Sequence, residues 1–257
     1  MNLEAIKAGI KEAGAAVLRT APTEGVTIKE GRLNYVTAAD LASERVLKET
    51  IQRNFPNHLI LSEETESDLN DPLTVEHLWV IDPIDGTSNF KNGREYAGIS
   101  VGYVEMGEPM AGFIYDPFRD QLFHAVKGEG AYLDEAKIHA SDTDDLGKAT
   151  LLTDNSYEPN GTKRNLQLVA SLPQNPWVLM RGSAVLAYAD IAAGRADIYV
   201  HQFFKPWDNA AGFVIAKEAG AVIKRFNGED GTFLDSALVI GNQALVNQFL
   251  EAQGVKV

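Results

Sequence analysis

Two stretches near the start of the chain carry hydrophobic residues at helical spacing. A first amphipathic helix is predicted over residues 2–19, where the apolar positions are Leu3, Ile6, Ile10, Val17 and Leu18. A second helix is predicted from Thr37 to about residue 54, because Thr37-Ala38-Ala39-Asp40 has the S/T-x-x-D/E form of a capping box and Pro56 follows the last turn. Its buried stripe is expected to consist of Leu41, Leu47, Ile51 and Phe55.

Short apolar runs bounded by turn residues predict strands along the rest of the chain. The predicted strands cover residues 26–28, 58–62, 79–81, 96–104, 109–116, 121–127, 149–153, 177–180 and 237–241. Helical patterns cover residues 162–171, 183–193, 209–219 and 242–252, and a polar, turn-rich run predicts a surface loop at 65–77. The middle strands read as an antiparallel meander, and helices alternate with strands after them. We therefore predict an α+β protein built from stacked layers.

The length and composition are those of an ordinary globular protein. The chain has 257 residues, of which 45% are hydrophobic and 23% are charged. It contains no internal repeat, no low-complexity tract and no linker long enough to separate independent domains. We expect one compact unit made of two halves, residues 1–145 and 146–257, which meet around residues 141–148.

Charge and cysteine content exclude several classes of function. A net charge of −13 disfavours nonspecific binding to nucleic acid or to an anionic membrane. The absence of cysteine excludes disulfides, thiolate zinc sites and cysteine nucleophiles. Glu4 and Glu12 lie among the N-terminal apolar residues and argue against a secretory signal, and no apolar run reaches the roughly 18 residues of a membrane span. We therefore expect a cytoplasmic protein with neither a nucleic-acid nor a membrane partner.

A turn that follows the short strand at residues 79–81 carries the most specific chemistry. Asp82 and Asp85 lie three residues apart, and Pro83 between them stiffens the turn. Two carboxylates in such a turn suit a hard cation, which prefers oxygen ligands. Gly86 lets backbone approach a ligand closely, and Thr87 can open a helix whose first amides point at an anion. The order of these residues predicts a metal-assisted phosphate site.

Two other interpretations of this turn compete with the phosphate site. Asp-Pro and Asp-Gly are common in loops, and Asp82 could simply cap a helix. A calcium-binding EF-hand loop needs acids at its positions 1, 3 and 5, a glycine at 6 and a glutamate at 12. Here the second acid is at relative position 4, Gly86 is at 5 and Gly93 replaces the glutamate, so the EF-hand register fails.

Three blocks of sequence resemble one enzyme family. The run Asp82-Pro83-Ile84-Asp85-Gly86-Thr87-Ser88-Asn89-Phe90 is similar to the signature of the inositol monophosphatase family of magnesium-dependent, lithium-sensitive phosphatases. The other blocks are Leu61-Ser62-Glu63-Glu64 upstream and Pro206-Trp207-Asp208-Asn209-Ala210-Ala211-Gly212 downstream. They occur in the order found in the family, and family-like sequence covers nearly the whole chain. The resemblance implies a five-layer α-β-α-β-α sandwich, a metal site between its two sheets, and a homodimer.

The candidate metal ligands are carboxylates from three separate segments. They are Glu63, Asp82, Asp85 and Asp208. A donor set of oxygens, without cysteine and without a histidine pair at zinc spacing, favours Mg²⁺ over Zn²⁺. The backbone carbonyl of Ile84 is a plausible fifth oxygen and matches a backbone ligand in the family. We expect two or three Mg²⁺ ions in each active site.

The catalytic roles follow from what phosphate-ester hydrolysis requires. A metal-assisted phosphatase must deliver an activated water while it neutralises the phosphate oxygens. We assign Glu63 and Thr87 to position and deprotonate the water, and Asp85 with the Gly86 and Thr87 amides to the phosphate. Gly182, Ser183 and Ala184 lie at a predicted helix start that matches the family's contact with the alcohol portion of the substrate. Ser183 could equally be a helix cap, and the two roles can coexist.

The residues leave the roles of three further side chains open. Asp40 is explained by its capping box, yet an acid at this position lies near the metal cluster in the family. Lys29 likewise matches a lysine near that cluster. Adjacent residues that leave a strand point in opposite directions, so only one of Glu63 and Glu64 is expected to face the same metal directly. The family resemblance implies that Glu63 is the ligand and that Glu64 lies near it, around an outer metal.

The expected activity is hydrolysis of a small phosphorylated polyol or sugar, most of all an ester of the inositol 1-phosphate type. Fructose 1,6-bisphosphate, NADP, histidinol phosphate and nucleotide bisphosphates are alternative substrates. Ser88-Asn89-Phe90 replaces the Lys-Glu-Phe form typical of nucleotide bisphosphatases and disfavours that branch. A non-catalytic, metal-binding regulatory protein is a different class, and the presence of Glu63 and Thr87 argues against it.

Specificity is where the chain departs from the best-known family pattern. Inositol-selective members tend to carry a glutamate seven residues before the Trp-Asp aspartate, and here that position is His201. A protonated imidazole would favour a second anionic group on the substrate, and Lys205 would do the same if it faces the pocket. The alternative is that His201 lies at the rim and contacts nothing. We expect broad specificity.

Overall fold

The computed structural model describes residues 3–30, 34–65 and 71–256. The helices are α1 (Leu3–Arg19), α2 (Ala38–Asn54), α3 (Thr87–Lys91), α4 (Gly161–Ala170), α5 (Ala184–Ala192), α6 (Pro206–Glu218) and α7 (Gln243–Ala252), with a 3₁₀ turn at Pro72–Thr74. Part of the loop expected at 65–77, including Glu66 and Asp68, lies outside the described residues.

The strands form two large sheets and one small hairpin. A seven-stranded sheet has the order β3 (Leu59–Ser62), β4 (Leu78–Asp85), β5 (Gly98–Glu105), β6 (Glu108–Asp116), β7 (Gln121–Val126), β8 (Gly130–Leu133) and β9 (Ala136–Ile138). A five-stranded sheet has the order β11 (Trp177–Met180), β10 (Thr150–Thr153), β12 (Ile198–His201), β14 (Leu238–Gly241) and β13 (Val222–Arg225). The hairpin pairs β1 (Thr27–Glu30) with β2 (Asn34–Val36).

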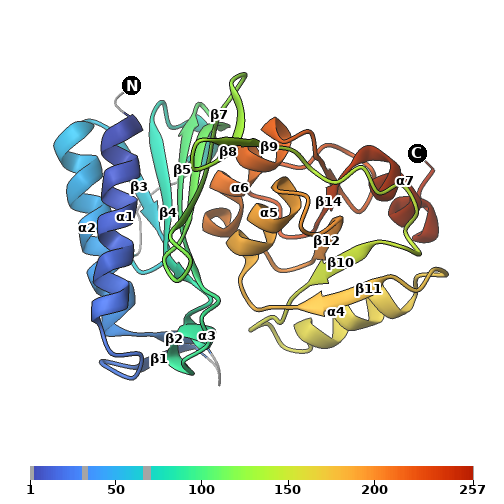
Figure 1. Cartoon of the computed structure of the whole chain (residues 1–257), viewed down its shortest axis with the longest axis horizontal. Helices are drawn as coiled ribbons and strands as arrows, with labels where there is room; N and C mark the ends of the chain where they lie inside the picture. Colours follow the sequence, from blue (N-terminus) through green and yellow to red (C-terminus); the bar gives the residue numbers. More distant parts are fainter. Residues whose placement is uncertain (1–2, 31–33, 66–70, 257) are drawn as a thin grey trace.

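The elements stack in five layers, which run from left to right in Figure 1. Helices α1 and α2 cover one face of the seven-stranded sheet, and α5 and α6 lie between the two sheets. Helices α4 and α7 cover the outer face of the five-stranded sheet. The predicted α-β-α-β-α sandwich is therefore confirmed. The division into halves at residues 141–148 stays a prediction.

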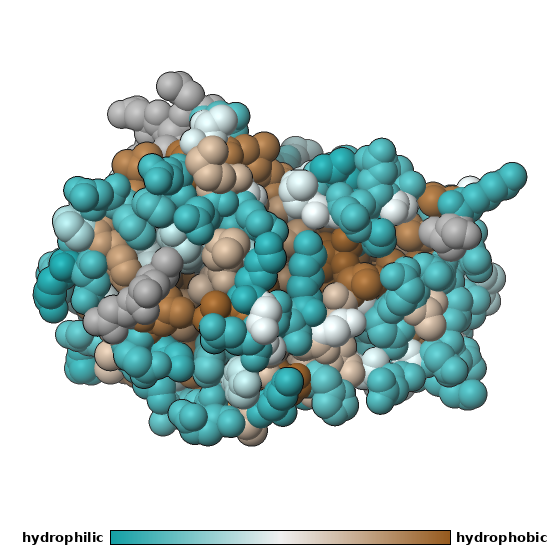
Figure 2. All heavy atoms as spheres, turned by 90° about the horizontal axis from the view of Figure 1, so that it is seen from above, coloured by the Kyte–Doolittle hydropathy of each residue, from teal (hydrophilic) through white to brown (hydrophobic). Residues whose placement is uncertain are grey.

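Three apolar cores fill the spaces between these layers. Strand β4 shows why the seven-stranded sheet is buried on both faces, because side chains alternate along a strand. Leu78 and Val80 pack in the core shared with α5 and α6, whereas Trp79 and Ile81 pack in the core under α1 and α2. The outer surface seen from above in Figure 2 is mainly hydrophilic, with hydrophobic residues in a few patches.

Helix α6 approaches the seven-stranded sheet unusually closely because two strand residues lack a side chain. A Cβ atom on Gly102 would lie 2.7 Å from the Ala210 Cβ atom, and one on Gly112 would lie 2.3 Å from the Ala211 carbonyl oxygen. Larger residues at these positions would push the helix away from the sheet. This contact sets the position of the helix start, which carries Asp208.

Several details differ from the sequence-based expectation. Strands β2, β8, β9, β12 and β13 were not predicted, and α6 begins at Pro206, three residues before the expected start. The capping box of α2 is present as predicted. Leu41 is 54% exposed instead of buried, because the face of α2 that carries Ala39, Leu47 and Ile51 is the one turned toward the core.

Candidate active site

A β-bulge at the end of β4 turns two aspartates to the same side. Asp82 pairs with Ser100 of β5 and Asp85 pairs with Gly98, so two residues of β4 lie opposite one of β5. In a regular strand, residues three apart point to opposite faces. The extra residue of a bulge restores the same orientation, and this irregularity contains Pro83, which cannot donate a ladder hydrogen bond.

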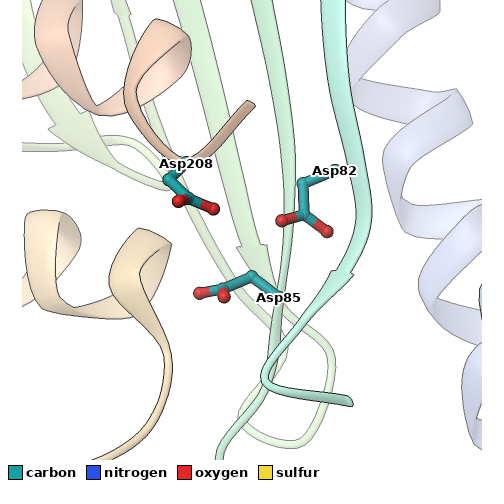
Figure 3. Close-up of side chains that lie close together, drawn as sticks. All are labelled: Asp82, Asp85 and Asp208. Carbon is teal, nitrogen blue, oxygen red and sulfur yellow. The ribbon is translucent and has the colours of Figure 1, made fainter. Parts of the chain in front are cut away.

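A third aspartate joins them from the start of α6. One carboxylate oxygen each of Asp82, Asp85 and Asp208 can be chosen so that all three lie within 4.8 Å of one another. Figure 3 shows the three side chains converging from β4 and from the beginning of α6. Asp208 also accepts a hydrogen bond from the Lys205 amide at 2.7 Å through Oδ2. The helix cap and the cluster therefore use the same side chain.

Glu63 comes to the cluster along the neighbouring parallel strand. Strand β3 pairs with β4 so that Ser62 lies beside Ile81, and the Glu63 amide donates to the Ile81 carbonyl at 3.3 Å. Glu63 thus follows β3 at the same sheet edge where Asp82 lies on β4. Its charge is one cause of the raised pKa of Asp82, so the two carboxylates are within electrostatic reach.

Lys29 of β1 holds Glu63 and Glu64 together. Its Nζ atom lies 2.9 Å from Glu63 Oε1 and also donates to Glu64 Oε1. The expectation that these two glutamates point in opposite directions was therefore wrong. Strand β3 ends at Ser62, so the alternation of a strand no longer governs the residues that follow. Burial and the charge of Glu63 raise the pKa of Glu64 to about 7.

The pKa values of the clustered carboxyl groups indicate a site for a cation that prefers oxygen ligands. Burial, followed by the charges of Glu63 and Asp85, raises the pKa of Asp82. Burial also raises the pKa of Asp85 to about 7, although hydrogen bonds from Ser183 and Val185 oppose the rise. The pKa of Asp208 rises through burial and the charge of Asp85. A divalent cation with oxygen ligands would relieve this repulsion, so the residues present fit Mg²⁺.

These pKa shifts predict that Mg²⁺ stabilises the protein more at neutral than at acid pH. A carboxyl whose pKa is raised on folding binds its proton more tightly in the native state, so its contribution to stability falls as pH rises from about 4 to 7. Mg²⁺ replaces those protons. At 100 times its Kd a ligand adds about 2.7 kcal/mol, so we expect a rise in Tm of several degrees at pH 7.5. At pH 5 the rise should be much smaller, and an equal rise at both pH values in thermal unfolding would contradict this assignment.

Thr87 contacts an aspartate that the sequence offered mainly as a cap. The Thr87 hydroxyl lies 2.9 Å from Asp40 Oδ1 and 2.9 Å from the Ile84 carbonyl oxygen, so its single hydrogen goes to one of them at a time. Asp40 Oδ2 meanwhile accepts hydrogen bonds from the Thr37 amide and hydroxyl at 2.8 and 2.5 Å. Burial raises the pKa of Asp40. Asp40 thus caps α2 and also touches the proposed catalytic hydroxyl.

The turn at Gly86 leaves two amides free for an anion. Gly86 has a φ of +91°, and a Cβ atom there would lie 3.0 Å from the Gly182 carbonyl oxygen. The left-handed conformation and this close approach both favour glycine. Among the described residues, the Gly86 and Thr87 amides have no hydrogen-bond acceptor. These two amides lie at the beginning of the short helix α3, which starts at Thr87 as the sequence predicted.

The segment 182–184 lies against the cluster. Ser183 caps α5 by accepting a hydrogen bond from the Leu186 amide at 3.3 Å, and its hydroxyl donates to Asp85 Oδ2 at 2.6 Å. The predicted helix cap at Ser183 is therefore present, and the expected contact with the substrate stays a prediction. The Gly182 carbonyl contacts helix α3, which follows the Gly86 turn, by accepting a hydrogen bond from Asn89 Nδ2 at 3.2 Å. Ala184 is the first residue of α5 and is half-buried.

The structure places His201 in the core and not in an open pocket. It is the last residue of β12, is 5% exposed, and its Nδ1 lies 2.9 Å from Asn165 Nδ2. Burial lowers the pKa of His201 to about 3, so the imidazole is neutral at physiological pH. The positive charge on which its expected role depended is therefore absent. Lys205 is half exposed, and its Nζ atom lies 3.7 Å from Glu158 Oε1.

Two residues near the site were missed by the sequence analysis. Asp154 follows β10, and its Oδ1 accepts from the Gly182 amide at 2.6 Å, which helps to hold the segment 182–184. Tyr157 lies in the same loop with an exposed ring. Although much of the residue is exposed, burial around its hydroxyl group, followed by the charges of Asp85 and Glu63, raises the pKa of Tyr157, so the hydroxyl lies within electrostatic reach of the cluster. Asp154 could have been found as an acid at the end of a predicted strand, whereas Tyr157 carries no sequence signal.

The five-layer fold and its cluster of three acids, of which Asp82 is buried and Asp85 and Asp208 are half-buried, define a metal-dependent phosphatase of the layered α+β type. The family model described as the inositol monophosphatase family matches residues 2–254. The chain therefore belongs to the inositol monophosphatase family, whose members are magnesium-dependent phosphatases. The resemblance on which the sequence analysis relied is confirmed.

Individual relatives agree with this family. The chain is 35% identical to an inositol-1-monophosphatase of Bacillus subtilis over 252 residues, which cover 96% of this chain and 94% of that protein. It is 38% identical to a Nus factor SuhB of Xylella fastidiosa over 212 residues, 81% of this chain and 75% of that protein. The structure of an inositol monophosphatase from Anabaena (Nostoc) sp. PCC 7120 superposes with a TM-score of 0.85 at 33% identity, covering 100% of this chain and 98% of that one. In the part of the chain that the structure describes, no helix is long and apolar enough to cross a membrane.

Proposed function

We propose that this protein hydrolyses a small phosphorylated polyol or sugar, of the inositol 1-phosphate type, in a Mg²⁺-dependent reaction. The observation that carries the proposal is the convergence of Asp82, Asp85 and Asp208 beside a turn whose Gly86 and Thr87 amides have no acceptor among the residues that the structure describes. An enzyme for phosphate monoesters must hold both a cation and an anion within a few ångströms, and these two features provide for both. The Bacillus relative, named for inositol 1-phosphate, supports the substrate class.

The proposed metal ligands are the carboxylates of Glu63, Asp82, Asp85 and Asp208 together with the Ile84 carbonyl. The Thr87 hydroxyl lies 2.9 Å from that carbonyl oxygen, and even when it donates there the carbonyl oxygen keeps a second lone pair for a metal. Bound Mg²⁺ would neutralise phosphate oxygens and lower the pKa of a water molecule. Two or three ions in each active site remain our expectation.

The chain's own residues would position the substrate and move the proton. The Gly86 and Thr87 amides would donate to phosphate oxygens. A lone pair of the Thr87 hydroxyl would accept a hydrogen bond from the attacking water while its hydrogen is directed to Asp40 Oδ1. Glu63 is the second acceptor for a proton of that water, and Lys29 holds its Oε1 in place. Ser183 orients Asp85 through its hydrogen bond.

The proposal is tested by measuring phosphate release from a panel of esters with Mg²⁺ and with a chelator. The panel contains inositol 1-phosphate, fructose 1,6-bisphosphate, NADP, histidinol phosphate and a nucleotide bisphosphate. We expect Mg²⁺-dependent turnover with inositol 1-phosphate among the best substrates, and inhibition by millimolar Li⁺ as in the family. A protein that binds Mg²⁺ but releases phosphate from none of these esters would support the alternative of a non-catalytic regulatory protein. That alternative is considered because some relatives are named as Nus factors.

We also propose that the protein forms a homodimer through the free edge of the five-stranded sheet. Strand β11 lies at that edge and exposes Trp177, Val178 and Met180, with 71% of Trp177 accessible. An unpaired edge strand with apolar side chains favours association with another chain. Replacing Trp177 with lysine should shift the mass measured by sedimentation from dimer to monomer, and a monomeric unmodified protein would refute the proposal.

A cytoplasmic location remains an expectation.

A further inference from the structure

A concave site lies between α5 and the turn that joins β6 to β7. It is a cavity of about 140 Å³ that shares no lining residue with the carboxylate cluster. Three arginines line it, Arg119, Arg181 and Arg195, together with the carboxylates of Asp116 and Asp190. One buried water requires roughly 10–15 Å³, so the cavity has room for a ligand of several non-hydrogen atoms.

The ion pairs around this arginine cavity use only part of each guanidinium. Arg119 Nη1 lies 2.7 Å from Asp116 Oδ2, and Arg181 Nη1 lies 2.8 Å from Asp190 Oδ2. Arg195 Nη1 reaches Asp190 only at 3.8 Å. A guanidinium carries five N–H donors. Among the described residues, no acceptor is bound by the Nε or Nη2 atoms of these three arginines.

Charge and aromatic rings prepare the cavity for an anion. Three guanidinium groups face two carboxylates, which leaves one positive charge in a protein whose net charge is −13. The Arg181 guanidinium lies 4.2 Å from the centre of the Tyr96 ring, and that of Arg195 lies 5.3 Å from the centre of the Phe123 ring. Such stacking holds a guanidinium plane in place before a ligand arrives. The side chains of Arg119, Arg181 and Arg195 remain 40–45% exposed, so solvent reaches them.

We propose that the arginine cavity binds a small oxyanion with two negative charges, outside the active site. Arginine pairs with phosphate and carboxylate oxygens through two parallel hydrogen bonds, and the unused donors here are suited to that geometry. Free phosphate and the phosphoryl group of a small ester share this chemistry. Arg195 Nη1 donates to Gln121 Oε1 at 3.0 Å and so helps to tie the end of α5 to β7, whereas its Nε and Nη2 atoms bind no acceptor among the described residues and are available to a ligand. The site does not depend on the proposed enzymatic substrate.

The test is calorimetric titration of the full chain with inorganic phosphate and with glycerol 2-phosphate, in the presence and absence of Mg²⁺. Without Mg²⁺ the carboxylate cluster repels phosphate, so binding under that condition reports the arginine cavity. With Mg²⁺ a second binding event should appear at the active site. Binding to the cavity should weaken as ionic strength rises, because it depends on charge.

Arg119→Gln and Arg195→Gln are the test variants, because Arg181 directly precedes Gly182 of the candidate active site. Each should weaken Mg²⁺-free phosphate binding about tenfold or more, since each removes a charged donor. Arg195→Lys should bind phosphate more tightly than Arg195→Gln but less tightly than the unmodified protein. Lysine keeps the positive charge and loses the pair of parallel N–H donors of a guanidinium. Arg53→Gln, on the exposed side of α2, removes the same charge elsewhere and should have no effect. Thermal unfolding checks that every variant is folded.

The outcomes are distinct. Binding of inorganic phosphate alone would identify free phosphate as the ligand, and binding of both probes would extend the site to phosphoryl esters. Absence of Mg²⁺-free binding up to tens of millimolar would overturn the proposal. Equal affinity in the Arg119, Arg195 and Arg53 variants would overturn it too. None of these results depends on catalytic activity, so failure of the proposed function would be recognised separately.

Discussion

Replacing Asp82 with asparagine is expected to lower kcat/KM by more than the roughly 10–100-fold that typically follows loss of a hydrogen bond supporting a metal ligand. Asparagine keeps the shape of the side chain but removes the charge that a cation would bind. Asp82 is 1% exposed and lies beside Asp85 and Asp208, and a neutral water in its place would not restore the negative charge that is lost. Phosphate release measured over a range of Mg²⁺ concentrations would show both lower activity and a higher Mg²⁺ requirement.

Stability separates this loss from unfolding. Burial and neighbouring negative charges raise the pKa of Asp82, so an ionised Asp82 destabilises the metal-free fold at neutral pH. Asp82→Asn should therefore leave the Tm of the Mg²⁺-free protein unchanged or raise it, and should reduce the rise that Mg²⁺ produces. Asp142→Asn makes the same substitution at an exposed position and should change neither property. Full activity of Asp82→Asn at limiting Mg²⁺ would refute the metal assignment.

The sequence predicted the acidic cluster well because each acid is tied to a local pattern. Asp82 and Asp85 follow an apolar strand with a proline between them, and Asp208 is the third residue of a helix that begins with proline. These patterns place a carboxylate at the end of an element. Which element ends meet in space does not follow from such local patterns. The match to three family blocks supplied that information for Glu63, Asp82 and Asp208.

Contacts between distant segments were the part that could not be predicted from local pattern. The Asp40–Thr87 hydrogen bond joins residues 47 positions apart, and the Ser183–Asp85 hydrogen bond joins residues 98 apart. In each pair one side chain, that of Asp40 or of Ser183, was already explained locally as part of a helix cap. The structure shows that the cap and the contact with the site are made at once, by different atoms of Asp40.

The error at His201 has a physical cause. Its role was inferred by counting back from Asp208, which assumes that the intervening residues run as they do in inositol-selective proteins. In this protein His201 ends β12, an inner strand of the five-stranded sheet, and packs 4.8 Å from the Phe204 ring. Strand β12 itself was missed because its short apolar run, Ile198 to Val200, carries no clear alternation of polar and apolar residues.

Replacing Thr87 with alanine is the second change with a large expected effect. A group that directs proton transfer typically contributes about 10²–10⁴-fold to rate, and the Thr87 hydroxyl lies 2.9 Å from the Asp40 carboxylate that would receive its hydrogen. We expect kcat to fall within that range while KM changes little, because the Thr87 amide that holds phosphate is retained. Steady-state kinetics with inositol 1-phosphate at saturating Mg²⁺ gives both constants.

Two further variants decide whether the hydroxyl acts through Asp40. Thr87→Ser keeps the hydroxyl and should recover most of kcat, whereas a slow serine variant would indicate that the methyl group's packing matters more. Asp40→Asn should lower kcat, and the double variant with Thr87→Ala should be little slower than the slower single variant, because coupled groups lose their effect together. Multiplying effects would show that the two residues act independently. A raised KM with unchanged kcat in Thr87→Ala would make Thr87 a binding residue and remove it from the proton path.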